Sequence, residues 1–262
     1  MARVIAGEAG GRRLAVPDGR NTRPTSDRAR EGLFSTVSSI SGPLAGAWVL
    51  DLYAGSGAVG LEALSRGAEH VLLVEHAARA VRVIRQNIEA LGLPGAVVAA
   101  DRVERVLARG PAPAAGQDGP APAGGQHGPA RHRYDVVFAD PPYAMPGTEV
   151  TRMLTLLLSG ADGADPRAGS TPPDPPGRPP REDIAEPGWL VPGALVVVER
   201  ATRSGPLSWP GRFVPDRARR YGEATFWYGH VRQTAGERAM TGLGQVLEYP
   251  PKSRKDDTAC NA

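Results

Sequence analysis

The strongest chemical pattern in the chain is Asp140, Pro141, Pro142 and Tyr143, directly after an apolar run at residues 134–139. An exocyclic amine on a nucleobase is a poor nucleophile because its lone pair is delocalised into the ring. If the Asp140 carboxylate and the Pro141 carbonyl each accept one N–H, the nitrogen is held closer to tetrahedral. Consecutive prolines fix φ, and the Tyr143 ring can stack on a base. These four residues are therefore candidate catalytic residues, although such a sequence is also common in ordinary turns.

A second pattern lies upstream, at residues 51–60, where three glycines match G-x-G-x-x-G between an apolar run and a helical stretch. Glycine allows a tight turn, and its missing Cβ lets a ligand approach the backbone. We therefore expect a nucleoside cofactor to bind here. The candidate cofactor-binding residues of this glycine turn are Asp51, Ala54, Gly55, Ser56, Gly57 and Gly60.

Two further acidic residues bear on which cofactor binds. Glu75 lies 20 residues after Gly55 and can accept the ribose hydroxyls, so a nicotinamide dinucleotide is the natural competitor. However, Asp51 would repel a pyrophosphate and attract a cation. Asp101 can accept a hydrogen bond from an adenine amino group. The chain also shows no separate substrate domain, which a dehydrogenase would usually need. These features favour S-adenosylmethionine. The alternative for Glu75 and Asp101 is that each caps the helix that follows it.

The elements around these residues alternate between strand and helix, which predicts an α/β fold. The final two strands follow one another directly and predict an antiparallel hairpin. We expect a Rossmann-like sheet of seven strands that is mostly parallel and whose last strand is antiparallel. Loops after the first and fourth strands should then meet at one edge. Strands are expected at 47–52, 70–75, 95–100, 134–139, 194–199, 212–217 and 224–231, and helices at 57–66, 77–91, 102–109 and 147–159.

The N-terminal residues 1–47 form a basic arm with seven arginines against four acidic residues, in a chain of net charge +3. We expect a hairpin at residues 2–16 and then a helix with Leu33, Phe34, Val37 and Ile40 on one stripe, which leaves Arg28 and Arg30 free to face solvent or a ligand. Arginine binds phosphate and stacks on bases, which favours a nucleic-acid partner. The alternative is a bias in composition, because lysine occurs only at positions 252 and 255.

Composition excludes several classes of protein. The single cysteine, Cys260, excludes a disulfide framework, and neither cysteine nor histidine spacing indicates a metal site. No apolar run is long enough to span a membrane and no signal peptide is evident, so we expect a soluble cytoplasmic protein. We predict a basic arm at 1–47, a main domain at 48–232 with disordered insertions near 110–131 and 160–187, and a disordered tail at 233–262.

Glu199 and Arg200 follow the fifth apolar run and are therefore near the expected crevice. We interpret them as a surface ion pair rather than as crevice residues. The tryptophans at 189, 209 and 227 are interpreted as packing residues rather than as base stackers.

With these motifs in view, the sequence resembles the RsmD-type 16S ribosomal RNA guanine-N2 methyltransferases over about residues 2–231. The glycine turn and residues 140–143 are shared by many amino-methyltransferases. The Arg-Pro-Thr-x-Asp-Arg-x-Arg-Glu pattern at residues 23–31 is much more specific. Further similarity lies at residues 3–7, 11–14, 22–34 and 61–68. The two insertions and the tail depart from the compact pattern of the family.

The resemblance implies a Rossmann-like class I methyltransferase fold with seven strands, in an enzyme that uses S-adenosylmethionine. It also implies that the substrate is a guanine in 16S rRNA, within the small ribosomal subunit or its assembly intermediate. It implies that residues 140–143 hold the guanine and that the glycine turn, Glu75 and Asp101 hold the cofactor. Neither a metal nor a membrane is implied as a partner. The candidate RNA-binding residues are Arg12, Arg13, Arg23, Arg28 and Arg30.

Two alternatives remain open at this point. The first is an amino-methyltransferase that acts on DNA adenine or on a protein glutamine, because both use acid-Pro-Pro-aromatic sites. A DNA enzyme usually carries a sizeable recognition region, whereas the insertions here are of low complexity. The second is a non-catalytic RNA-binding protein of ribosome assembly, against which the intact Asp140 and glycine turn argue.

Overall fold

The computed structural model describes residues 2–17, 27–111, 133–159 and 188–232. The segments predicted to be disordered lie outside these residues, apart from residues 110 and 111 at the start of the first insertion, which are described. Arg23 also lies outside the described residues. No described helix has the length and apolar character that a membrane span requires.

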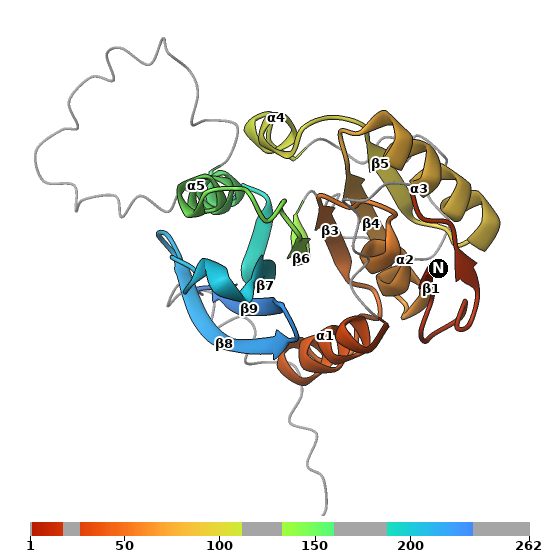
Figure 1. The fold of residues 1–262 in the computed structure, drawn as a ribbon, viewed down its shortest axis with the longest axis horizontal. Helices are drawn as coiled ribbons and strands as arrows, with labels where there is room; N and C mark the ends of the chain where they lie inside the picture. The colour runs from red at the N-terminus through yellow and green to blue at the C-terminus, as the bar shows by residue number, and fades with distance from the viewer. Residues whose placement is uncertain (1, 18–26, 112–132, 160–187, 233–262) are drawn as a thin grey trace, which may run out of the picture. The chain divides into compact units, whose positions relative to one another are not determined.

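A seven-stranded sheet organises the described part of the chain, in the order β5-β4-β3-β6-β7-β9-β8. Neighbouring strands from β5 to β7 are parallel, whereas β9 runs antiparallel to both β7 and β8. The predicted mostly parallel sheet with an antiparallel last strand is therefore confirmed (Figure 1). Its strands are β3 (Trp48–Leu52), β4 (His70–Val74), β5 (Ala96–Ala99), β6 (Tyr134–Ala139), β7 (Leu190–Ala201), β8 (Phe213–Tyr221) and β9 (Ala224–Val231).

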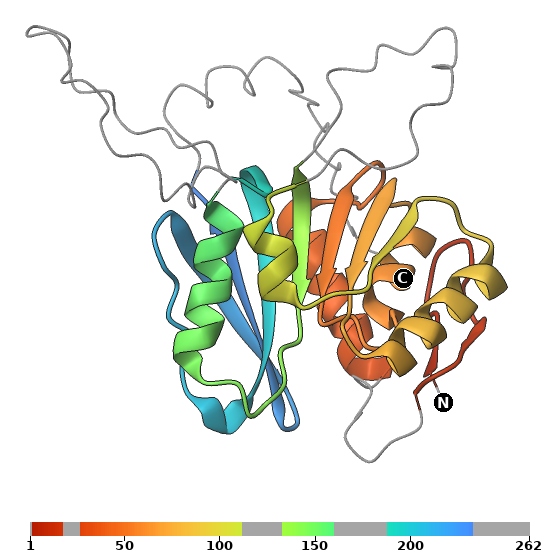
Figure 2. The same ribbon diagram turned by 90° about the horizontal axis from the view of Figure 1, so that it is seen from above.

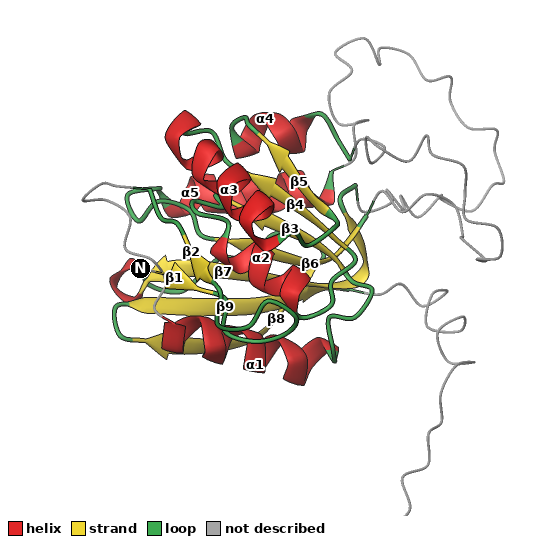
Figure 3. Ribbon diagram, turned by 90° about the vertical axis from the view of Figure 1, so that its right-hand side faces the viewer, coloured by secondary structure: helices red, strands yellow, loops and turns green. Residues whose placement is uncertain are grey.

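Helices cover both faces of this sheet, which explains why its parallel strands are continuous apolar runs (Figures 2 and 3). One face packs against α1 (Asp27–Ser41), α2 (Ala58–Ser65) and α3 (Ala78–Leu91). The other packs against α4 (Val103–Ala108) and α5 (Gly147–Leu158). A short 3₁₀ turn, η2 (Thr202–Ser204), follows β7. Trp189 is buried in this second cluster, and Trp209 and Trp227 pack against it, which confirms the predicted packing roles.

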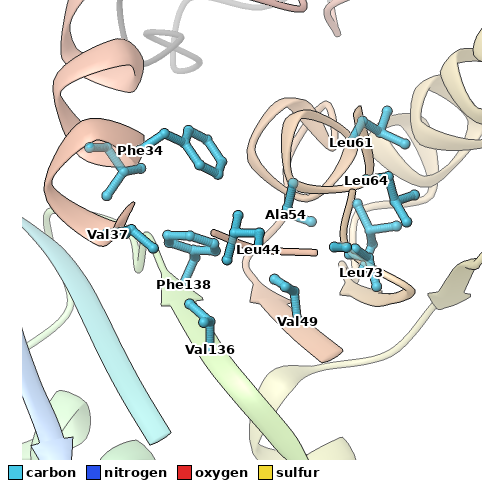
Figure 4. Close-up of a cluster of buried hydrophobic side chains, with 14 of the residues drawn as sticks. Phe34, Val37, Leu44, Val49, Ala54, Leu61, Leu64, Leu73, Val136 and Phe138 are labelled. Atoms are coloured by element: carbon cyan, nitrogen blue, oxygen red, sulfur yellow. The ribbon is translucent and has the colours of Figure 1, made fainter. Parts of the chain in front are cut away.

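Helix α1 belongs to the basic arm and packs against β6, the strand that leads into the acceptor loop at residues 140–143. Its Phe34 lies against Phe138 of β6, with ring centroids 5.5 Å apart (Figure 4). Leu33, Phe34 and Val37 are buried, as their predicted stripe requires, and Ile40 is partly buried against the same cluster. Because Phe138 is two residues before Asp140, the packing of α1 supports the start of the acceptor loop.

The predicted N-terminal hairpin is present, with β1 (Ala2–Arg3) antiparallel to β2 (Arg13–Leu14). Glu62 of α2 anchors it, because the fully buried carboxylate accepts hydrogen bonds from the Ile5 and Ala6 amides at 2.6 and 3.0 Å. Arg66 donates to the same carboxylate at 2.7 Å, so the buried charge is paired. The hairpin is therefore fixed to the helix that follows the glycine turn.

The close approach of the hairpin to α2 yields a stability prediction with an internal control. Gly7 and Gly11 have nearly equal φ values of 82° and 83°, but a Cβ on Gly7 would lie 1.7 Å from the Ser65 carbonyl oxygen, whereas one on Gly11 would meet nothing within 4 Å. Gly11→Ala should lower the free energy of unfolding by about 1 kcal/mol, the cost of a left-handed backbone. Gly7→Ala should lower it by about 3 kcal/mol or more, since backbone must also move. Equal losses in urea titrations would contradict this docking.

Candidate active site

Two loops that carry the chemical motifs leave the sheet side by side. Strands β3 and β6 are parallel neighbours, with Leu52 in register with Ala139. The Asp140 amide then donates to the Leu52 carbonyl at 3.3 Å, one residue beyond the strands. The glycine turn (residues 51–60) and the acceptor loop (residues 140–143) therefore start at the same edge, as the strand order predicted.

The glycine turn combines open backbone with tight packing. A Cβ at Gly55 would have only the Tyr53 carbonyl oxygen within 4 Å, at 3.9 Å, so the backbone there faces open space. At Gly60 a Cβ would lie 2.8 Å from a Val71 methyl carbon, so this glycine is needed where α2 meets the sheet. Gly57 has φ 78° and forms the N-cap of α2. The turn thus leaves ligand space at its first glycine and none at its last.

Asp51 is the buried carboxyl at the base of this turn. It is 4% exposed and accepts a hydrogen bond from the Gly60 amide at 2.9 Å. Burial raises its pKa to about 7, the Gly60 hydrogen bond opposes this shift, and the nearby charge of Glu75 adds to it. A cation placed next to Asp51 would relieve this unfavourable environment.

Glu75 fixes the turn from the neighbouring strand. Its Oε2 accepts from the Gly55 amide at 3.0 Å and its Oε1 from the Ala77 amide at 2.8 Å, directly before α3. Glu75 thus contacts the amide of Ala77, the N-cap residue of α3, and does not occupy the N-cap position itself. Each carboxylate oxygen has two acceptor sites, so these contacts leave capacity for hydroxyl donors. The assignment of Glu75 to a ribose remains a prediction.

Asp101 also has local partners. Its Oδ1 accepts from the Arg102 amide at 2.8 Å, and its Oδ2 contacts the Arg109 guanidinium. The Arg102 hydrogen bond and then the contact with Arg109 hold the pKa of Asp101 below its usual range. It follows β5, next to β4, at the same edge of the sheet as Glu75. Its side chain is 23% exposed, so an adenine amino group can still reach it.

The acceptor loop places a carboxyl and an aromatic ring at the surface. Asp140 is an exposed residue by its solvent accessibility, although nearby protein atoms partly desolvate its carboxyl group. This desolvation, followed by the charges of Glu199 and Asp51, holds the pKa of Asp140 well above its usual range. Tyr143 is 42% exposed and donates to Glu199 Oε1 at 3.2 Å. Asp140 and Tyr143 are thus both accessible, as a base-binding site requires.

Glu199 belongs to this site, contrary to the interpretation of Glu199 and Arg200 as a surface ion pair. The two residues are only 7% and 9% exposed. Strand β7 continues to Ala201, past the end of β6, and so carries Glu199 to the acceptor loop. The sequence did place both residues at the end of an apolar run, but it did not show how far the strand extends.

Tyr53 is a further residue of the site that the sequence analysis missed. It has φ 61°, a left-handed backbone that only a few non-glycine residues adopt. Its hydroxyl donates to Glu104 of α4 at 3.2 Å and lies 3.8 Å from the Met145 sulfur, three residues beyond Pro142. Tyr53 therefore links the two loops, and the only sequence signal was its position within the turn.

The candidate RNA-binding arginines have different environments. Arg30 is 1% exposed and donates to Asp27 at 2.9 Å and to the Arg3 carbonyl, so the prediction that it faces solvent or a ligand is wrong. It is buried because the hairpin closes over this side of α1. Arg12 donates to the carbonyls of Ala90 and Leu91 at the end of α3. Arg13 and Arg28 are exposed.

Asn87 of α3 connects the arm to the glycine turn. It is 2% exposed, and its amide exchanges two hydrogen bonds with the Ala15 backbone, at 2.8 and 3.0 Å. The same amide nitrogen donates to the Ser56 carbonyl at 3.0 Å. One buried side chain therefore fixes the positions of both segments. Among the described residues, no group of three side chains could hold a metal ion.

Comparisons with known proteins agree with this geometry. Residues 2–115 match the family model described as conserved hypothetical protein 95. The chain is 28% identical to ribosomal RNA small subunit methyltransferase D of Escherichia coli (strain K12) over 90% of this chain and 92% of that protein. A shorter match, 41% identical, covers 35% of this chain and 48% of the YlbH protein of Bacillus subtilis (strain 168), about half its length.

Solved structures show the same fold over most of the chain. The yhhF protein of Escherichia coli superposes with a TM-score of 0.63 at 25% identity, covering 88% of this chain and 98% of that one. A Thermus hypothetical protein, TTHA0928, gives a TM-score of 0.58 at 28% identity, covering 89% of this chain and 100% of that one. The predicted methyltransferase-type fold is confirmed, and over most of its length the chain is similar to ribosomal RNA small subunit methyltransferase D.

Proposed function

We propose that this protein transfers a methyl group from S-adenosylmethionine to the exocyclic N2 amine of a guanine in 16S rRNA, within the small ribosomal subunit or its assembly intermediate. The observation that carries this proposal is the meeting of the glycine turn and the acceptor loop around mutually repelling carboxyl groups. Asp51 and Glu199 both raise the pKa of Asp140, and Glu75 raises that of Asp51. Such a cluster favours a cationic ligand.

The cofactor fits the residues of the glycine turn. S-adenosylmethionine supplies an electrophilic methyl group on a sulfonium, and both its sulfonium and its ammonium are cations. Asp51 would attract this charge, and the open face of Gly55 would admit the ligand next to the backbone. Glu75 would accept from the ribose and Asp101 from the adenine amine. Gly57, Ser56 and Ala54 shape the turn and complete the proposed set.

The acceptor loop would then orient the guanine amine. Asp140 and the Pro141 carbonyl would each accept one N–H and hold the nitrogen near tetrahedral, with Pro142 restricting the backbone. A neutral Asp140 accepts such a bond poorly, and its raised pKa favours the neutral form. A bound cation lowers that pKa, so the cofactor would prepare Asp140 as an acceptor. Tyr143 would stack on the base.

The RNA assignment rests on the arm and on the relatives. The Escherichia coli relative that aligns over 92% of its length is named as a small-subunit ribosomal RNA methyltransferase. Arg13 and Arg28 are exposed on the hairpin and on α1, where they can contact phosphate. Arg23 remains a prediction, and Arg12 and Arg30 have structural partners instead.

The decisive experiment supplies labelled S-adenosylmethionine and small ribosomal subunits from a strain that lacks the endogenous relative. We expect label on the N2 atom of one guanine in 16S rRNA, mapped by nuclease digestion and mass spectrometry. Label on DNA adenine or protein glutamine would support the alternative amino-methyltransferases. Absence of any transfer, with RNA binding retained, would support a binding protein.

Replacement of the acceptor carboxylate tests the catalytic role of residue 140. Asp140→Asn keeps the shape but loses the charge that accepts the amine hydrogen, so kcat should fall by about 10²- to 10³-fold. Affinity for the cofactor, measured by calorimetry, should change less than about threefold. The control is Glu89→Gln, which neutralises an exposed carboxylate on α3. Retained kcat in Asp140→Asn would exclude the proposed role.

The raised pKa of Asp51 predicts a pH-dependent cofactor affinity. Below its pKa of about 7 the carboxyl is mostly neutral, and a cationic ligand favours the ionised form, so binding releases a proton. Affinity should therefore increase as pH rises from about 5.5 to 7.5, by at most about tenfold per pH unit. The charges of Glu75 and Asp140 also interact with that of Asp51.

Asp51→Asn isolates this residue, because an asparagine oxygen can still accept from the Gly60 amide. The variant should bind the cofactor more weakly at pH 7.5 and with a flatter pH dependence. Calorimetry in buffers of different ionisation enthalpy measures the released proton. An unchanged pH profile in the variant would assign the effect to another group.

The ring of Tyr143 is tested separately from its hydroxyl. Tyr143→Ala removes stacking worth about 1–3 kcal/mol per base and should raise the KM for the RNA substrate by about tenfold or more. Tyr143→Phe keeps the ring and loses only the hydrogen bond to Glu199, so its KM should stay within about threefold of the wild type. If both variants have the wild-type KM, stacking does not occur.

A further inference from the structure

The edge strand β8 carries an exposed row of arginines that the proposed site does not use. β8 is the last strand of the seven-stranded sheet, and residues 215–220 are all exposed. This segment contains Arg217, Arg219 and Arg220 against a single acid, Asp216. We call these three residues the β8 arginine strip. Charged side chains on an edge strand also prevent strand pairing between molecules, so the strip has a structural alternative.

The register of the sheet connects this strip to the acceptor site. Arg219 is paired with Phe226 of β9, and Phe226 is paired with Glu199 of β7. Neighbouring strands are about 4.8 Å apart, so the backbone of Arg219 lies about 10 Å from that of Glu199. Glu199 in turn accepts the hydrogen bond from Tyr143. A ligand bound at the acceptor loop is therefore within reach of an arginine side chain of the strip.

Arg217 and Arg219 also lie on the face of the sheet that packs against α1. Directly paired residues point to the same side, so Arg219 and Arg217 share the face of Phe226 and Tyr228, which pack in the same core cluster as α1. Helix α1 meets the end of β8, because a Cβ on Gly32 would lie 2.2 Å from the Tyr221 hydroxyl. Figures 1 and 3 show α1 beside β8 and β9.

Exposed Arg28 extends the basic surface from β8 onto α1. It is four residues before Gly32, and residues at this spacing lie on the same side of a helix. Arg28 is therefore one turn beyond the contact between Gly32 and Tyr221. The arginines of two elements, which are distant in sequence, thus border the acceptor site from the same side.

We infer that the β8 arginine strip binds the phosphate backbone of the RNA strand that flanks the target nucleotide. This inference rests on the proposed function for its choice of RNA. Arg217 and Arg219 are two residues apart on a strand and hence about 7 Å apart, a spacing similar to that of successive phosphates in an extended nucleic acid. Arginine forms bidentate bonds with phosphate, whereas edge protection alone would be served equally by glutamate. The strip guides the strand so that one base can enter the acceptor loop.

Charge reversal separates phosphate binding from edge protection. Arg217→Glu/Arg219→Glu keeps charges on the edge strand, and so keeps it protected, but repels phosphate. The matched control is Arg82→Glu/Arg85→Glu, which makes the same charge change at exposed positions of α3. Affinity for a fluorescein-labelled single-stranded RNA oligonucleotide is measured between 50 and 200 mM KCl, together with KM and kcat on small subunits.

For the β8 variant we expect at least a tenfold higher KM, a kcat within about threefold of the wild type and unchanged cofactor affinity. The slope of log affinity against log salt should decrease in magnitude by about 1.4, since each single-strand phosphate contact contributes about 0.7. Wild-type KM and salt slope in the β8 variant would overturn the inference. An equal effect in the α3 control would also overturn it, because net charge alone would then explain the loss.

The two proposals fail in different ways. If the wild type methylates rRNA and the β8 variant has an unchanged KM, only the strip is refuted. If the wild type modifies no RNA but the β8 variant loses oligonucleotide binding, only the proposed function is refuted. Circular dichroism reports folding of each variant. Should the double reversal unfold, Arg217→Gln/Arg219→Gln replaces it, with the same expected direction and a smaller effect.

Discussion

The parallel pairing of β3 with β6 is the constraint on which the site depends. These strands are far apart in sequence, yet their register places the Asp140 amide 3.3 Å from the Leu52 carbonyl, so two loops start from one edge. Helices on both faces keep this pairing buried, and α1 contributes directly through Phe34 against Phe138. A shift of one residue between the two strands would turn side chains to opposite faces and separate the carboxyl groups of the site.

The carboxyl groups at this edge lie in surroundings that disfavour their ionised forms, because they are desolvated and close to one another. Asp51 is buried with a pKa of about 7, and the pKa of Asp140 is held well above its usual range by desolvation and then by the charges of Glu199 and Asp51. The fold therefore holds both carboxyl groups where ionisation is unfavourable. For Asp51, the folded state binds more protons than the unfolded state between the reference pKa of 3.8 and about 7, so this group costs stability as pH rises through that window. A cationic ligand would offset this cost.

The sequence predicted the sheet and most of the site because the governing signals are local. Apolar runs marked each parallel strand, and the glycine spacing marked the turn. The failures share a physical cause: they depend on what packs against a residue from elsewhere. Arg30 is buried because the hairpin covers it, and Glu199 reaches the acceptor loop because β7 extends past β6. The positive φ of Tyr53 is likewise imposed by its surroundings, since no propensity favours it. The roles of Glu75 and Asp101 toward a ligand stay predictions.

The amide of Asn87 gives the molecule a mechanical link between two segments with separate tasks. The same nitrogen donates to Ala15 of the arm and to Ser56 of the turn, so displacement of either carbonyl leaves a buried donor short of a partner. Any coupling of this kind is reciprocal. If a molecule bound at the turn stabilises the position of residue 15, a molecule bound at the arm stabilises the position of residue 56 by the same free energy. A single buried side chain thereby couples the backbone position of the arm to that of the turn.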